Sequence, residues 1–159
     1  MTDALASPTS SGSAHDDPSI HPEILPDGVR LIRMPVIEDD RGSLAVFERP
    51  NHVPFPVARV FTIFGVPVGG RRGCHANRDL HELLIAIGGS VTVRLRTPDR
   101  EATVRLEHAS QGLYLPPMIW LEMQDFAPDT VLVVLASLPY EYDSHIQSYE
   151  EYCRLCRGS

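Results

Sequence analysis

The sequence predicts an all-β protein, built as a sandwich or barrel, with one short helix at its C-terminal end. Three observations lead to this prediction. From residue 29 onward, short apolar segments are separated by short polar turns, and we count about nine or ten of them. Several segments alternate between apolar and polar residues, which is the period of a half-buried strand. Helical spacing appears only after residue 144.

The chain of 159 residues suits one domain with a substantial core. Residues 1–27 are rich in serine, proline and aspartate and lack periodicity, so we expect a disordered arm there and a single domain over residues 28–159. The net charge of −7 disfavours non-specific binding of nucleic acid. No apolar run approaches a membrane span and no signal peptide is recognisable, so we expect a cytoplasmic protein without a membrane partner.

The expected strands follow from the apolar segments and the turns between them. Residues 58–66 alternate clearly: the odd-numbered residues from Arg59 to Ile63 face one way, and the even-numbered residues from Val60 to Phe64 face the other. The other expected strands are residues 29–37, 44–48, 83–87, 91–96, 102–106, 112–115, 119–125 and 130–137.

Residues 144–157 carry the helical pattern. Ile146, Tyr149 and Cys153 recur at helical spacing, and Ser144 is the expected N-cap. The segment contains a Cys-x-x-Cys pair, but neither a second pair of metal ligands nor a thioredoxin-like βαβ context accompanies it. We therefore expect neither a zinc site nor a redox site there.

Polar residues gather within residues 69–89, between two glycine pairs. His75 and Asn77 are two residues apart, so both side chains point to one face if the segment is extended. Imidazole titrates near neutrality, so a histidine facing the inside of a barrel is a natural general base, with a hydrogen-bonded structural role as the alternative. Arg72 falls on the opposite face from His75 unless the intervening glycine introduces a bulge. Arg71 or Arg72 could bind phosphate or lie on the solvated surface.

The spacing G-x4-H-x-N-x4-E-x6-G, which begins at Gly70, resembles the first motif of the cupins, where two histidines and a glutamate bind a metal. Asn77 replaces the second histidine here. Residues 112–125, where a cupin would supply a further histidine, contain none. We therefore predict a cupin-type jelly-roll barrel that holds no metal and no other cofactor, with a metal-dependent cupin as the alternative.

Five blocks in the same order resemble the nucleotide-sugar 3,4-ketoisomerases, which are WxcM-like, RmlC-like cupins that act on dTDP-4-keto-6-deoxy-D-glucose. The resemblance covers roughly residues 29–152. The blocks are RGSL from Arg41, RVFTIFGVP from Arg59, RGCHAN from Arg72, LPPMIWLEM from Leu115 and VLVVLAS from Val131.

The resemblance implies a metal-free jelly roll, usually a homodimer that exchanges strands, and a reaction that moves the ketone from C4 to C3 through an enediol. A base removes the proton from C3 and a proton is returned at C4. Hydrogen-bond donors or cations stabilise the enediolate oxygen. The implied partner is a dTDP-linked 4-keto-6-deoxyhexose in deoxysugar or aminosugar biosynthesis.

One position departs from the family pattern, which has His-x-His. Asn77 stands where the second imidazole is expected, and an amide does not carry protons at neutral pH. Water held by Asn77 could complete the transfer, with His75 serving both carbons. Alternatively, the protein is a related dTDP-ketosugar epimerase. It could also be a weak or inactive member, or a His-to-Asn variant, that binds the nucleotide sugar.

We predict His75 as the catalytic base and Asn77 as the second catalytic position. Arg59 and Arg72 are expected to serve the diphosphate or the developing oxyanion. The predicted substrate-binding residues are Arg41, Arg59, Phe61, Arg72, Tyr114, Trp120 and Glu122. For the aromatic residues among them, an ordinary place in the core is the alternative.

Overall fold

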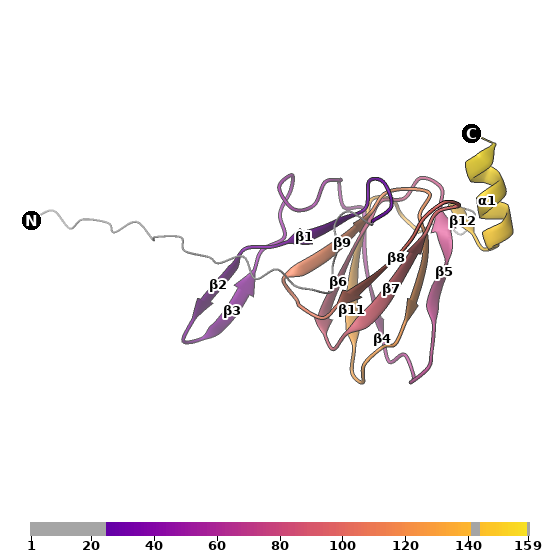
Figure 1. Cartoon of the computed structure of the whole chain (residues 1–159). Helices are drawn as coiled ribbons and strands as arrows, with labels where there is room; N and C mark the ends of the chain where they lie inside the picture. The colour runs from indigo at the N-terminus through magenta and orange to yellow at the C-terminus, as the bar shows by residue number, and fades with distance from the viewer. Residues whose placement is uncertain (1–24, 141–143, 159) are drawn as a thin grey trace, which may run out of the picture.

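The computed structural model describes residues 25–140 and 144–158, so the predicted arm lies outside the described residues except for residues 25–27 (Figure 1). The elements are β1 (Arg30–Arg33), β2 (Val36–Asp39), β3 (Gly42–Ala45), β4 (Arg59–Phe64), β5 (Arg72–Asn77), β6 (Glu82–Gly88), β7 (Val91–Arg96), β8 (Glu101–Leu106), β9 (Gln111–Leu115), β10 (Trp120–Gln124), β11 (Val131–Ala136), β12 (His145–Ile146) and α1 (Tyr149–Arg157).

Two five-stranded antiparallel sheets enclose the core. The first has the strand order β1-β9-β6-β11-β4, and the second has the order β12-β5-β10-β7-β8. The main core cluster takes residues from both sheets, among them Leu84, Val93, Leu121 and Leu132. The prediction of an all-β jelly roll with a short C-terminal helix is confirmed, and the strands around the core form two sheets instead of one closed barrel.

The strand predicted over residues 29–37 is interrupted. β1 pairs with β9, whereas β2 pairs with β3 in a separate hairpin. Pro35 lies between β1 and β2 and has no backbone N–H to donate to a ladder, which explains the break. The hairpin extends away from the two sheets (Figure 1) and exposes Val36, Ile37 and Leu44.

The helix is shorter than predicted. It begins at Tyr149, and the side chain of Ser148 caps it by accepting a hydrogen bond from a backbone N–H of the first turn. The predicted start at Ser144 is wrong because the following residues form β12 (His145–Ile146), which pairs with β5 and buries its isoleucine. Pairing with a sheet edge overrides the helical spacing of these residues.

Helix α1 covers the outer face of the second sheet. Tyr152 is fully buried there, in a cluster with Ala76, Trp120 and Ile146. Its hydroxyl donates to the backbone carbonyls of Arg96 and Met118 at 3.1 and 2.9 Å. Helix α1 therefore covers the outer face of β5 and β10, and only their inner face is available to a ligand-binding site. No helix in the described part of the chain is long and apolar enough to cross a membrane.

Candidate active site

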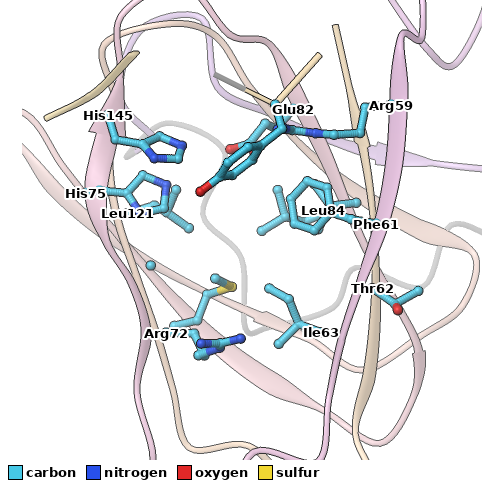
Figure 2. Close-up of a pocket in the computed structure, with 14 residues that line it drawn as sticks. Arg59, Phe61, Thr62, Ile63, Arg72, His75, Glu82, Leu84, Leu121 and His145 are labelled. Atoms are coloured by element: carbon cyan, nitrogen blue, oxygen red, sulfur yellow. The ribbon is translucent and has the colours of Figure 1, made fainter. Parts of the chain in front are cut away.

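A pocket of about 460 Å³ lies between the two sheets (Figure 2). Strands β4, β6 and β11 supply one wall, and β5, β10 and β12 supply the other. The volume suits a small organic ligand. The described residues that line the pocket are Arg59, Phe61, Thr62, Ile63, Arg72, Gly73, His75, Glu82, Leu84, Leu121, Met123, Val134, Tyr140 and His145.

Strand β4 presents one face to this pocket, as its alternation predicts. Arg59, Phe61 and Ile63 are buried or half-buried, whereas Val60 and Phe64 on the opposite face are 58% and 70% exposed. The predicted binding residues Arg59 and Phe61 thus share a wall (Figure 2).

A β-bulge brings Arg72 and His75 to the same pocket. On β10, Leu121 pairs with His75 and Glu122 pairs with Gly73, so Cys74 is the extra residue. Gly73 and Cys74 both have positive φ, at 77° and 57°. A Cβ atom at Gly73 would lie 2.9 Å from the carbonyl oxygen of Leu121, so the bulge depends on glycine. In a regular strand Arg72 and His75 would point to opposite faces, but the extra residue lets both side chains reach the pocket.

His75 is half-buried on the inner face of β5, and its imidazole points into the pocket (Figure 2). Its ring centroid lies 4.7 Å from that of His145 on β12. Burial lowers the pKa of His75 below the ordinary 6.5, and His145 lowers it further, while a hydrogen bond with the Gly73 backbone acts in the opposite direction. At neutral pH the imidazole is therefore neutral and able to accept a proton.

Glu82 is the first residue of β6 and points into the pocket from the opposite sheet (Figure 2). Its side chain is buried, and Asn77 Nδ2 donates a hydrogen bond to Glu82 Oε2 at 3.2 Å. Burial raises the pKa of Glu82 to about 7, although the Arg59 guanidinium and the Asn77 amide lower it in part. The carboxyl is therefore poised to exchange a proton near neutral pH.

Arg59 offers unused hydrogen-bond donors beside Glu82. The Arg59 Cζ atom lies over the rings of Phe61 and Tyr140, 5.0 and 5.3 Å from their centroids, at cation–π distance. The Nε and Nη1 atoms of Arg59 are buried and have no hydrogen-bond partner among the described residues. Buried donors of this kind suit an anionic ligand group.

Asn77 does not line the pocket itself but lies behind Glu82. It is 4% exposed, and its Oδ1 atom has no hydrogen-bond partner in the described part of the chain. His75 and Asn77 occupy one face of β5, since Ala76 between them belongs to the cluster under α1. The structure thus places the side-chain amide of Asn77 where its hydrogen bond orients the carboxyl group of Glu82.

Four of the predicted binding residues lie outside the pocket. Arg41 is at the tip of the β2–β3 hairpin, where its guanidinium pairs with Asp39. Tyr114 faces the outer side of the first sheet, and its hydroxyl is 2.8 Å from His81 Nδ1.

Trp120 and Glu122 point to the outer face of the second sheet, because Leu121 and Met123 take the inward positions of β10. The indole Nε1 of Trp120 donates to Glu122 at 2.9 Å, and Arg94 and Arg96 flank the same carboxylate at 3.5 and 3.7 Å. Trp120, Glu122 and the two arginines therefore interact with one another on the side of the sheet that faces away from the pocket.

Three titratable residues of the pocket, Glu82, Tyr140 and His145, are not among the site residues predicted from the sequence. Glu82 was visible as the glutamate of the cupin-like spacing, but the absence of histidine partners removed it from consideration together with the metal. His145 was assigned to a helix. Tyr140 carried no signal, because it follows β11 in a segment without periodicity. Among the described residues, no group of three or more His, Cys, Asp or Glu side chains is placed to hold a metal ion.

The chain resembles a group of enzymes that isomerise nucleotide sugars. It is 35% identical over 123 residues to a TDP-4-oxo-6-deoxy-alpha-D-glucose-3,4-oxoisomerase from Aneurinibacillus thermoaerophilus, a match that covers 77% of this chain and 88% of that enzyme. The structure is similar to QdtA, a sugar 3,4-ketoisomerase from Thermoanaerobacterium thermosaccharolyticum solved with TDP. The TM-score is 0.81 at 37% identity, over 84% of this chain and 98% of that chain.

A histidine-to-asparagine variant of QdtA, solved with TDP-4-keto-6-deoxyglucose, matches with the same TM-score of 0.81 at 36% identity, over 84% of this chain and 97% of that chain. The family model described as FdtA, WxcM-like, C-terminal matches residues 27–157. A match over this length leaves only the N-terminal residues and the last two outside it. The chain therefore belongs to the FdtA, WxcM-like C-terminal family.

Proposed function

We propose that this protein is a 3,4-ketoisomerase that converts dTDP-4-keto-6-deoxy-D-glucose into a dTDP-3-keto-6-deoxyhexose through an enediol. The observation that carries the proposal is the imidazole of His75, which lies inside a pocket of sugar size in a chain of this family and whose pKa is lowered by burial. The relatives solved or studied as 3,4-ketoisomerases support the same reaction and substrate class.

His75 acts as the base that removes the proton from C3. The carbonyl at C4 makes this proton acidic, because the electron pair left on C3 delocalises onto the C4 oxygen. A neutral imidazole accepts the proton, and the resulting imidazolium can return it at C4, so one residue serves both carbons. Burial of His75 favours this role since it keeps the ring unprotonated before substrate binds.

Arg59 and Arg72 serve the anionic parts of the substrate. Arg59 offers two buried donors without partners among the described residues, and Arg72 reaches the same pocket through the β-bulge. One guanidinium would bind the diphosphate and the other would stabilise the negative charge that develops on O4 as the C3 proton leaves. Phe61, stacked beside Arg59, supplies apolar contact to the sugar.

A sugar-nucleotide-binding protein without catalysis is the second candidate function, and Asn77 favours it. An amide at this position cannot replace the proton transfer of a second imidazole. The epimerase alternative has less support, because the similar enzymes above 25% identity are 3,4-ketoisomerases.

Two further features belong to this proposal. The protein works in the cytoplasm on a soluble nucleotide sugar, and it acts as a homodimer. The exposed apolar side chains of the β2–β3 hairpin support a contact with a second copy: Val36 is 43%, Ile37 59% and Leu44 57% exposed. Light scattering of the purified chain of 17.6 kDa would then give the mass of two chains, and a monomer would overturn the dimer.

Proton NMR of the protein with dTDP-4-keto-6-deoxy-D-glucose in deuterated water tests the function. A new 3-keto sugar is the expected result, with deuterium at C4 to the extent that the His75 imidazolium exchanges with solvent before it returns the proton. The same reaction in ordinary water gives the coupling constants of the C4 proton, which report the C4 configuration. Deuterium at C3 without a new ketone would mean that His75 works but the second transfer fails. Binding without any exchange would instead establish the binding protein.

A further inference from the structure

We propose that Glu82 is a second catalytic residue, which moves the oxygen-bound proton of the sugar while His75 moves the carbon-bound proton. The inference rests on the proposed function, since it concerns the same pocket and substrate. It would explain how a chain with asparagine at position 77 can complete the reaction.

The first argument is position. His75 on β5 and Glu82 on β6 belong to opposite sheets, and both side chains reach into the same pocket (Figure 2). A sugar held between the sheets would therefore have the imidazole on one side and the carboxyl on the other. The two groups can then act on neighbouring carbon and oxygen atoms without competing for one place.

The second argument is orientation. Asn77 Nδ2 donates to Glu82 Oε2, and this bond leaves the other carboxyl oxygen able to face the substrate. Asn77 is buried and does not line the pocket. It is thus a positioning residue, and its inability to carry a proton is no obstacle when the carboxyl carries one.

The third argument is charge. The charged or titratable groups that share the pocket with Glu82 are Arg59 on β4, Arg72 and His75 on β5, Tyr140, and His145 on β12. On the strands that flank β6, Glu82 pairs with Leu115 of β9 and Ala136 of β11, which carry no charge. Burial outweighs the opposing effect of Arg59 and raises the pKa of Glu82 to about 7. A protonated carboxyl therefore coexists with a neutral His75 close to neutral pH.

The proton balance closes without any further reactant. As His75 takes the C3 proton, the C3–H electron pair forms the C3=C4 double bond and protonated Glu82 donates to O4, which gives a neutral enediol. The carboxylate of Glu82 then takes the proton from O3, C3 becomes the ketone, and C4 receives the proton from the His75 imidazolium. The C3–H and O3–H bonds break, C4–H and O4–H bonds form, and both residues return to their starting states.

The test compares Glu82→Gln with the full-length protein, using turnover of dTDP-4-keto-6-deoxy-D-glucose and calorimetric binding of TDP. The amide keeps the shape and the contact with Asn77 but cannot exchange protons at this pH. We expect kcat to fall about 10²-fold or more, TDP affinity to stay unchanged, and the loss of rate at alkaline pH to disappear. Glu101→Gln, the same exchange at an exposed residue of β8 outside the pocket, should leave activity unchanged.

Glu82→Asp provides the second variant, because it keeps a carboxyl. It should be more active than Glu82→Gln and should retain an alkaline loss of rate. Full activity of Glu82→Gln with an unchanged pH profile would overturn the role of Glu82 while leaving the ketoisomerase function intact. Absence of isomerisation by the unmodified protein would overturn the proposed function first, before any variant is compared.

Discussion

Two glutamates of this protein are buried to nearly the same degree but have different surroundings. Glu82 is 6% exposed and Glu122 is 8% exposed. Glu82 faces the pocket and receives one amide hydrogen bond, whereas Glu122 faces the outer side of its sheet and lies beside an indole N–H and the guanidinium groups of Arg94 and Arg96. Burial alone does not make a carboxyl reactive. The partners of the two side chains differ: Glu122 is fixed by an indole and two guanidinium groups, whereas Glu82 has one amide partner and faces an open pocket.

The same contrast separates the two faces of the β5–β10 pair. The outer face is filled by α1, with Trp120 and Tyr152 buried against it. The inner face keeps His75, Leu121 and Met123 around an open pocket. The outer face therefore contributes packing, and the pocket proposed for catalysis lies on the inner face.

The largest expected effect comes from His75→Asn. This change removes the proposed base, so turnover should fall about 10³-fold or more while TDP binding, measured by calorimetry, remains. His108→Asn is the matched control, since His108 is exposed and lies outside the pocket, and it should retain full activity. If His75→Asn isomerised the sugar at the normal rate, the mechanism would have to be abandoned.

The pH dependence of kcat/KM gives the next largest effect. The rate should fall as the pH drops below the pKa of His75, which lies below 6.5, because the protonated ring cannot accept a proton. It should also fall as the pH rises above about 7, since Glu82 then loses the proton it must donate. Each limb should reach about tenfold per pH unit. A rate that stays constant from pH 7 to pH 9 would contradict the assignment of the acid to Glu82.

Stability measurements compare the two glutamates directly. The pKa of Glu82 rises from about 4.5 in the unfolded chain to about 7 in the folded protein, so the folded state keeps a proton that the unfolded state has released. Its contribution to the free energy of unfolding is therefore retained below pH 4.5 and lost as the pH rises to 7, by about 3 kcal/mol in total.

Glu82→Gln should remove this loss. The difference in free energy of unfolding between pH 4.5 and pH 8 should therefore be smaller for the variant than for the unmodified protein. Glu122→Gln should instead destabilise by about 1 kcal/mol, because it weakens the contacts with the two arginines. Urea unfolding at both pH values measures both variants. If the two substitutions destabilised the protein equally at pH 8, the proposed difference between the surroundings of Glu82 and Glu122 would be wrong.

The smallest effect is expected from Asn77→His. If Glu82 carries the second proton and the imidazole N–H takes over the hydrogen bond that Asn77 donates to Glu82, the new ring adds no missing step, and turnover should change by no more than about threefold. Binding of TDP should be unaffected, since Asn77 does not line the pocket. A large rise in turnover at constant TDP affinity would show that the native chain lacks a proton relay, and Glu82 would then not be that relay.

Several features of the site could be predicted from local sequence. The alternation of residues 59–64 placed Arg59 and Phe61 together because a strand has a period of two. The same period leaves one choice open. It separates Trp120 and Glu122 from Leu121 and Met123, but it does not say which pair faces inward. That choice depends on α1, which packs against the outer face and buries the indole.

By itself, the sequence determined the all-β class, the family and the presence of His75 in a polar segment, because these depend on local periodicity and on ordered motifs. Only the tertiary structure decided that the bulge at Cys74 joins Arg72 to His75, that β12 brings His145 beside them, and that Glu82 is buried opposite. Each of these facts arises from pairing or burial between segments distant in the chain. The pKa of a carboxyl depends on such surroundings and not on its neighbours in sequence.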